Sequence, residues 1–195
     1  TLTRTYANLA ETVIVPTPAM ESRLRSLGVV TPIAVIPSGI DVEHFAGGRR
    51  QAALRAALGA DEEAVLILLV SRLGREKNTV LALDALTALG NPKAHLVLAG
   101  EGPQRPALVA AARAARLEDR VHFLGHVPRE QLPDLYASCD AFVFPSLTET
   151  QGLVLAEALV AGLPIVAVDT PQTREVLAGA GRLVAARPDA LAEAL

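Results

Sequence analysis

Two carboxylates, Glu149 and Glu157, stand in the part of this sequence that is richest in residues able to do chemistry. Glu149 follows the apolar run 141–144, which predicts a strand, and Glu157 lies in a helical pattern that begins near Gly152. The start of a helix carries free N–H groups and a partial positive charge, so it suits an anion such as a phosphate. Ionised carboxylates accept strong hydrogen bonds from hydroxyl groups. The segment therefore predicts a site for a ligand with both phosphate and hydroxyl groups.

Glu157 is the only charged residue between Gly152 and Val168, and its helical neighbours three and four positions away are all apolar. A lone buried carboxylate is costly unless a partner pairs with it or donates a hydrogen bond to it. One interpretation is a buried acid that binds a ligand. The other is an acid that points to water from a narrow polar stripe, which many helices carry. The spacing leaves both interpretations open.

Three cations follow the apolar run 65–70 in the stretch Ser71 to Asn78, namely Arg72, Arg75 and Lys77. A planar guanidinium and an ammonium group are the side chains that bind phosphates most readily. Arg72 and Lys77 are therefore candidates for a diphosphate clamp. The alternative is a solvated charged turn, because loops are commonly polar and exposed.

Two more loops follow predicted strands. The run Gly100 to Pro103 has only part of a dinucleotide fingerprint, because the third glycine is missing, and it predicts a tight turn that passes close to a ligand. The run Gly125 to Pro128 has backbone groups that could read a nucleobase edge, and we assign no proton-transfer role to His126. The histidines show no metal-ligand spacing, so the sequence predicts no metal site.

Composition excludes several classes of protein. The chain has 195 residues, 51% of them apolar, and a formal net charge of -3, which argues against a general nucleic-acid binder. Aromatic residues make up only 3%, so aromatic base-stacking platforms are not expected. The single cysteine, Cys139, excludes an internal disulfide, which favours the cytoplasm. Cys139 is expected to pack as a small apolar residue. The apolar stretch 153–168 is too short and too interrupted to span a bilayer.

Short apolar runs alternate with helical patterns through most of the chain. Strands are predicted at 65–70, 95–99, 121–124, 141–144, 165–168 and 182–184, and helices at 51–58, 79–89, 103–116, 129–137, 153–161 and 171–177. The strands are continuously apolar, which is typical of a parallel sheet covered on both faces. The pattern predicts an α/β fold with a doubly wound, Rossmann-like parallel sheet and a ligand beyond the carboxyl ends of its strands. Ahead of it, the sequence predicts strands at 11–15 and 33–36 and a helix at 18–27 capped by Thr17.

Several motifs occur along the chain in a definite order. They are Val35 to Asp41 with Phe45, Ser71-Arg72-Leu73 with Glu76-Lys77-Asn78, Leu98 to Pro103, Phe123 to Val127 through Leu135-Tyr136 and Cys139-Asp140, Phe144-Pro145-Ser146 with the pair Glu149 and Glu157, and Gly162-Leu163-Pro164. In this order and spacing they resemble the retaining glycosyltransferases of the GT-B fold, specifically the large family 4, also called group 1. The similarity covers nearly the whole chain.

The resemblance implies roles for individual positions. Arg72 and Lys77 would act in catalysis by neutralising the diphosphate of a nucleotide sugar as it leaves, and Glu149 would contact the donor sugar. Substrate-binding residues would be Glu157 at the ribose hydroxyls, the amides of Gly152, Leu153 and Val154 at the sugar and phosphate, Val127 at the base through its backbone, and Gly102. The resemblance implies no cofactor and no metal, because two side-chain cations can do that work.

The resemblance also implies a division of the chain. Residues 1–32 would be the tail of an N-terminal acceptor domain with a linker, and residues 33–195 the donor-binding domain, cut within its C-terminal helix. The expected partners are a nucleotide sugar, the missing N-terminal domain and, through that domain, a membrane surface, with no nucleic acid. The expected location is the cytoplasm, at the inner membrane face in a peripheral manner. Such a fragment is expected to be inactive alone.

The sequence departs from the family pattern in two places. Family members often carry Glu-Gly-Phe-Gly where this chain has Glu149-Thr150-Gln151-Gly152, a form that looks like that of synthases glycosylating diacylglycerol. The common double glycine after 165–168 is replaced by Thr170 to Thr173, which puts a backbone contact from that loop in doubt. Three alternatives stay open: a sugar-nucleotide epimerase of the same fold, a non-catalytic nucleotide-binding module, and a nicotinamide-dependent oxidoreductase, which the missing third glycine disfavours.

Overall fold

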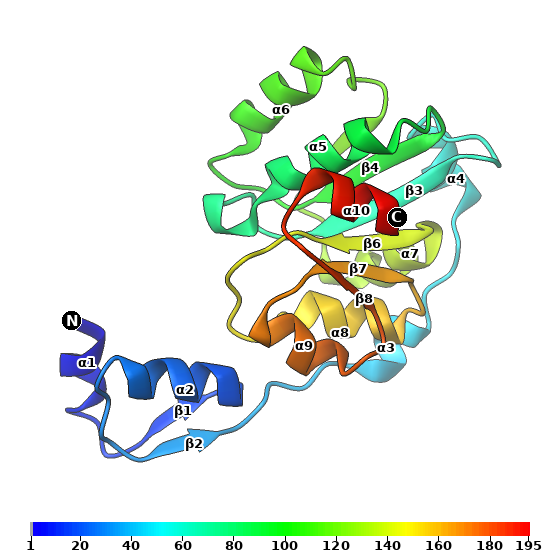
Figure 1. Cartoon of the computed structure of the whole chain (residues 1–195). Coiled ribbons are helices and arrows are strands. Elements are labelled where there is room, and N and C mark those ends of the chain that lie inside the picture. The colour runs from blue at the N-terminus through cyan, green and yellow to red at the C-terminus, as the bar shows by residue number, and fades with distance from the viewer. Residues whose placement is uncertain (1) are drawn as a thin grey trace.

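The computed structural model describes residues 2–195 and is built around one parallel sheet (Figure 1). Six strands run in the order β5-β4-β3-β6-β7-β8, and every neighbouring pair is parallel. They are β3 (Val65–Val70), β4 (Ala94–Ala99), β5 (Val121–Gly125), β6 (Ala141–Phe144), β7 (Ile165–Val168) and β8 (Arg182–Val184). The α/β fold with a doubly wound parallel sheet is confirmed.

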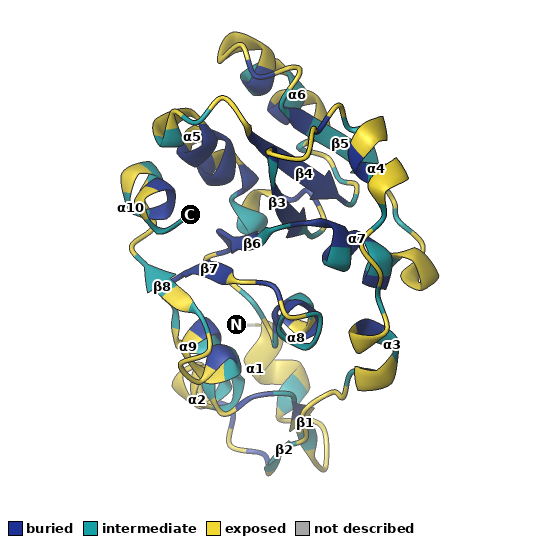
Figure 2. Ribbon diagram, turned by 90° about the vertical axis from the view of Figure 1, so that its right-hand side faces the viewer, coloured by how far each residue is buried: buried dark blue, intermediate teal, exposed yellow. Residues whose placement is uncertain are grey.

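Helices cover both faces of this sheet, which is why its strands are continuously apolar. One face packs against α5 (Thr79–Leu89), α6 (Arg105–Ala114) and α10 (Pro188–Ala194). The other face packs against α3 (Val42–Ala46), α4 (Ala52–Ala57), α7 (Leu132–Ser138), α8 (Leu153–Val160) and α9 (Pro171–Leu177). Figure 2 shows the central strands in dark blue and the outward sides of the helices in yellow. We call residues 42–195 the main domain.

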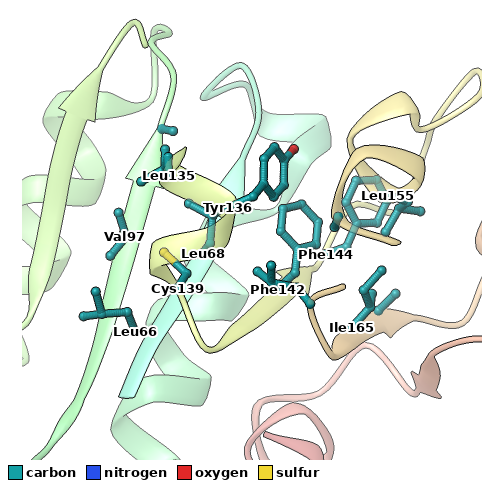
Figure 3. Close-up of a cluster of buried hydrophobic side chains, with 14 of the residues drawn as sticks. Leu66, Leu68, Val97, Leu135, Tyr136, Cys139, Phe142, Phe144, Leu155 and Ile165 are labelled. Atoms are coloured by element: carbon teal, nitrogen blue, oxygen red, sulfur yellow. The ribbon is translucent and has the colours of Figure 1, made fainter. Parts of the chain in front are cut away.

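The core on the second face contains most of the aromatic side chains of the main domain. Tyr136 of α7 lies beside Phe142 of β6 with 5.8 Å between ring centroids, and Phe144 and Leu155 belong to the same cluster (Figure 3). Tyr136 and Phe142 are completely buried. Cys139 is 5% exposed in this cluster, and burial raises the pKa of its thiol to about 12, so the expectation that it packs as an apolar residue is confirmed.

The order of the strands creates a switch point between β3 and β6. The chain leaves β3 toward β4 on one side, whereas β6 lies on the other side of β3. Loops that leave the carboxyl ends of two such strands diverge, and ligands of doubly wound folds bind in the crevice between them. The loops at this point are 71–78, which includes the 3-10 turn η1 (Arg75–Lys77), and 145–152. A second 3-10 turn, η2 (Arg129–Gln131), precedes α7.

A small unit precedes the main domain. It contains α1 (Leu2–Ala7), β1 (Val13–Val15), α2 (Pro18–Ser26) and β2 (Ile33–Val35), and β1 and β2 form a parallel sheet of their own. We call residues 2–35 the first unit and residues 36–41 the linker. Figure 1 shows the first unit set apart from the main sheet, with the linker leading to α3. Several large apolar side chains are exposed on it, among them Leu9 at 78% and Val30 at 80%.

The pairing of β2 corrects one expectation. The boundary predicted between residues 32 and 33 would place Ile33–Val35 with the donor-binding domain. Instead β2 pairs with β1 and belongs to the first unit. The physical reason is that a three-residue apolar strand can join either sheet, and its sequence does not distinguish them. The helices α1 and α3 were not predicted either.

In the described chain, residues 2–195, no helix combines the length and the apolar character needed to cross a bilayer.

Candidate functional site

A cleft of about 700 Å³ opens at the switch point of the sheet. Three parts of the chain line it: the loop after β3, the loop after β6 with the start of α8, and the first unit with the linker. The lining residues that matter below are Arg72, Glu76 and Lys77 from the first part, Glu149, Gln151, Gly152, Leu153 and Val154 from the second, and Met20, Arg23 and Ser38 from the third. The sequence predicted the first two parts correctly as neighbours, because both loops leave carboxyl ends of parallel strands.

Lys77 and Glu149 form an ion pair across the cleft floor, although they lie 72 residues apart in the chain. Their side chains are only 19% and 15% exposed, so the pair is partly shielded from water. The turn η1 is held to the loop after β6 by Asn78 Nδ2, which donates to Pro145 O at 3.3 Å, and by Ser146 Oγ, which donates to Glu76 O at 3.3 Å. These bonds fix Lys77 and Glu149 in one place.

Arg72 also faces a carboxylate, that of Glu76 four residues later. The Arg72 and Glu76 side chains are 65% and 37% exposed, so this pair contributes little to stability. A hydrogen bond from its own backbone amide, together with the Arg72 guanidinium, holds the pKa of Glu76 below its usual value. A Cβ at Gly74 would collide with the Glu76 carboxylate, so the glycine leaves the room that this carboxylate occupies. The solvated-turn interpretation fits the exposure of Arg72 but not the half-buried Lys77.

The start of α8 lines the same cleft as the two cations and the linker. Gly152 precedes the helix in the left-handed conformation with a φ of 72°, which favours glycine, and Leu155 N donates to Gly152 O at 2.9 Å. Among residues 2–195, no side chain caps this helix, so its leading amides at Leu153 and Val154 have no side-chain acceptor. Since Gly152, Leu153 and Val154 line the cleft, these N–H groups and the helix dipole are available to an anion.

Glu157 lies inside the protein rather than on an outer face. Glu157 is 6% exposed, and Tyr136 Oη donates to Glu157 Oε2 at 2.9 Å. Burial, reinforced by the neighbouring carboxylate, raises the pKa of Tyr136. The interpretation in which Glu157 points to water is therefore wrong. The carboxylate does not line the cleft, although a single pocket shared with Arg72 and Lys77 would require it to. It lies one helical turn beyond Val154, and Val154 lines the cleft.

A second cavity of about 470 Å³ adjoins the cleft and shares Ser71, Arg72 and Val154 with it. It is lined further by Glu101 from the loop after β4 and by His126 and Val127 from the loop after β5. Val127 therefore lies next to the cleft. Gly102 lines neither cavity: its Cα packs against the backbone of Leu73, where a Cβ would collide with Leu73 O. The expectation that Gly102 faces a ligand is not met, because this glycine serves the close packing of two loops.

The first unit is tied to the loop that carries Glu149. Thr17 Oγ1 donates to Thr150 O at 3.3 Å, and Thr17 is 3% exposed. The Gln151 side chain bonds both backbone groups of Ser38, with Ser38 N donating to Oε1 at 3.1 Å and Nε2 donating to Ser38 O at 2.8 Å. The Thr-Gln form of this loop, which departs from the family pattern, thus joins the linker to the loop. Sequence reasoning missed Met20, Arg23 and Ser38, because no periodic pattern relates them to the main sheet.

The segment Cys139-Asp140, which resembles part of the nucleobase segment of the family, lies at the opposite edge of the sheet. Asp140 Oδ2 accepts from Leu66 N at 2.8 Å, at the start of β3, and from Arg55 at 2.9 Å. Arg55 is 6% exposed and donates also to Ser138 O at 3.0 Å. Neither Cys139 nor Asp140 lines the two cavities, so their role in this structure is to hold strands and helices together.

The sequence model of the family described as "Glycosyl transferases group 1" matches residues 50–195. Among characterised proteins, the chain is 30% identical over 182 residues to the alpha-monoglucosyldiacylglycerol synthase of Streptococcus pneumoniae, covering 90% of this chain and 41% of that protein. It is 33% identical over 196 residues to the GDP-mannose-dependent alpha-(1-6)-phosphatidylinositol dimannoside mannosyltransferase of Mycobacterium tuberculosis, covering 98% of this chain and 50% of that protein.

Among solved structures, the chain matches HepE from Anabaena, a crystal structure in complex with UDP and glucose, with a TM-score of 0.87 and 26% identity. The match covers 98% of this chain and 55% of HepE. The chain therefore spans about half the length of the relatives that it matches. The function has to be explained from three features: the cleft, the uncapped start of α8, and two cations that each face a carboxylate.

Proposed function

The chain belongs to the family of glycosyl transferases group 1, and on that premise we propose that it is the donor-binding part of a retaining glycosyltransferase, which moves a sugar from a nucleoside diphosphate sugar to an acceptor. Because the chain spans about half of its relatives, the property proposed for the chain itself is binding of the donor. We propose that transfer needs the further domain that such relatives have, and that this chain transfers poorly or not at all by itself.

One observation carries the proposal: Arg72, Lys77 and the uncapped start of α8 line one cleft at the switch point of a doubly wound sheet. A departing nucleoside diphosphate gains negative charge, and fixed cations and oriented N–H groups stabilise that charge without having to reorganise. Lys77 suits this role as a point charge, and Arg72 as a planar fork that can bond two phosphate oxygens. No metal or other cofactor is part of the proposal.

The remaining residues suggest how a donor would lie. The diphosphate would occupy the cleft beside Lys77 and the amides of α8, with the sugar near Glu149. The base would occupy the adjoining cavity, where backbone groups at Val127 can read its edge. Glu157 lines neither cavity, and we propose that it binds the ribose hydroxyls from its position one helical turn beyond Val154, which lines both. Its Oε2 is taken by Tyr136, whereas Oε1 accepts no hydrogen bond from any of residues 2–195 and is free for a hydroxyl donor.

The acceptor and the location are further proposals, which rest on the relatives of the chain and not on the site itself. The names of two relatives contain diacylglycerol, a lipid, and phosphatidylinositol dimannoside, a glycolipid. We propose a glycolipid acceptor for the whole enzyme, and with it a peripheral position at the cytoplasmic face of a membrane through the further domain. A glycan acceptor without lipid would leave the donor site unchanged.

Calorimetric titration of the chain with UDP and GDP tests the proposal. We expect wild-type protein to bind at least one of the two, and binding to be unchanged when EDTA is added. Arg72→Gln and Glu157→Gln should each weaken that binding by about tenfold, the cost of one lost charged hydrogen bond. Arg113→Gln, an exposed change on α6, removes the same charge as Arg72→Gln and serves as the matched control for that variant. Affinities unchanged in both site variants would reject the assigned site.

A further inference from the structure

One cation of the cleft has no counter-charge. Three cationic side chains line the cleft, and two of them face carboxylates: Arg72 faces Glu76, and Lys77 faces Glu149. The third is Arg23 of α2, which is exposed and, within residues 2–195, forms no ion pair and no side-chain hydrogen bond. The surplus positive charge of the cleft therefore belongs to a residue of the first unit and not to the main domain.

The position of Arg23 follows from how α2 begins. Thr17 caps the helix by accepting a hydrogen bond from Met20 N at 3.2 Å. Residues three positions apart share a helix face, and Met20 and Arg23, which are three positions apart on α2, both line the cleft. The next arginine differs: Arg25 donates to Val29 O at 3.0 Å and Thr31 O at 2.7 Å and so holds the end of its own helix. Arg25 is structural, whereas Arg23 has no structural partner.

The wall that carries Arg23 is fixed relative to the other two cations. The cap residue Thr17 bonds to Thr150 O, and Gln151 bonds to both backbone groups of Ser38. These contacts join the first unit and the linker to the loop that contains Glu149. Since Glu149 is paired with Lys77, the same short loop connects the helix of Arg23 to the opposite cation. The helix that carries Arg23 is therefore joined to the loop of Glu149 through its cap residue Thr17, and the linker is joined to the same loop through Ser38.

We propose that Arg23 binds a phosphate group of the ligand in this cleft, as a third cation opposite Arg72 and Lys77. The inference rests on the proposed function and extends it to a residue outside the main domain. A guanidinium without a carboxylate partner presents its whole fork to a phosphate, and no competing anion has to be displaced from it. The phosphate could belong to the donor's diphosphate or to a phosphorylated second substrate, and the experiment separates these two sources.

The experiment compares Arg23→Gln and Arg23→Lys with the exposed control Arg113→Gln. Each protein is titrated with UDP, GDP and inorganic pyrophosphate, and then with glycerol 3-phosphate in the presence of saturating nucleotide. We expect Arg23→Gln to weaken binding of at least one phosphate ligand by about five- to twentyfold, as loss of one charged hydrogen bond does. Arg23→Lys should recover part of the loss. A loss with UDP, GDP or pyrophosphate identifies the donor phosphates, and a loss confined to glycerol 3-phosphate identifies a second substrate.

The outcomes separate this inference from the function on which it rests. If the wild-type chain binds nucleotide and Arg23→Gln binds every ligand equally well, the role of Arg23 is rejected and the donor site stands. If the wild-type chain binds none of the ligands, the proposed function fails and the role of Arg23 fails with it. Because Arg23 is exposed, its replacement should leave the melting temperature within about 1 °C of wild type, so a loss of binding will not reflect unfolding.

Discussion

Tyr136 and Glu157 are joined by a hydrogen bond inside the core, with Tyr136 Oη 2.9 Å from Glu157 Oε2. Tyr136 is completely buried and Glu157 is 6% exposed. The bond explains how an otherwise apolar helix tolerates a carboxylate, since a buried acid without a donor would destabilise the fold. The bond also fixes the orientation of the carboxylate, because the Tyr136 ring packs against Phe142 and has little freedom to move.

Tyr136→Phe should destabilise the protein by about 1 to 3 kcal/mol, because the Glu157 carboxylate then loses its donor while it stays buried. Thermal or urea unfolding measures the change. The other tyrosine of the chain, Tyr6, is 70% exposed, so Tyr6→Phe is the matched control and should change stability by less than about 0.5 kcal/mol. Equal stability of the two variants would show that the bond contributes nothing.

Lys77→Gln should weaken nucleoside diphosphate binding by about tenfold or more and lower the free energy of unfolding by about 1 to 3 kcal/mol. The second effect arises because the replacement leaves Glu149, only 15% exposed, without a counter-charge. The other lysine, Lys93, pairs with Glu63 at the surface, with side chains 46% and 73% exposed. Lys93→Gln should therefore leave binding unchanged and cost less than about 1 kcal/mol. Identical titration curves for the two variants would exclude Lys77 from the site.

The pair His95 and His122 should make the protein less stable in mild acid. His95 Nδ1 lies 2.9 Å from His122 Nε2 on neighbouring strands, and burial lowers the pKa of both rings, with Arg120 adding to the effect at His95. The native pair resists protonation, whereas unfolded histidines take up protons near pH 6.5. As pH falls through that value, the unfolded state binds more protons and the free energy of unfolding decreases.

Urea unfolding between about pH 7.5 and about pH 5.5 measures this dependence. His122→Gln should flatten it, because one of the two rings with a lowered pKa is gone. The exposed His126 is the control, and His126→Gln should keep the wild-type slope. A slope that both variants share would assign the pH dependence to other groups.

Asp140→Asn should destabilise the main domain by about 2 to 3 kcal/mol, since it leaves the buried Arg55 without its counter-charge. The carboxylate also accepts from Leu66 N at 2.8 Å and from Arg50 at 2.9 Å, so several bonds weaken together. The surface pair of Asp169 and Arg174 offers the comparison, and Asp169→Asn should cost less than about 1 kcal/mol. Nucleotide binding should survive both changes, because neither acid lines the cleft.

The main sheet could be predicted from the sequence because its strands are buried on both faces. A run such as Val65–Val70 is then apolar throughout, and it differs clearly from the helical patterns beside it. The same regularity predicted the loops of the site, since parallel strands end at one edge. Arg72, Lys77 and Glu149 come together for that reason, as the sequence predicted.

The contacts that depend on tertiary packing could not be predicted in this way. The partner of Glu157 is Tyr136, 21 residues earlier on another helix, and no spacing rule relates the two. The sheet to which Ile33–Val35 belongs depends on which strand is nearer in the folded chain, and its three residues suit either. Arg23 lies on a helix outside the main sheet, so the rule that locates ligands at strand ends says nothing about it.

The separate two-stranded sheet of the first unit has a consequence for how the protein fluctuates. A sheet of only two strands has no further strand paired on either side, so its amide hydrogens are poorly protected from exchange. The side chains of Leu9 and Val30 in the same unit are exposed to water. In deuterium oxide, β1 and β2 should exchange their amides orders of magnitude faster than β3 and β4. The exception is the start of α2, where the hydrogen bond from Thr17 to Thr150 of the main domain should slow exchange. Bound nucleotide should slow it further.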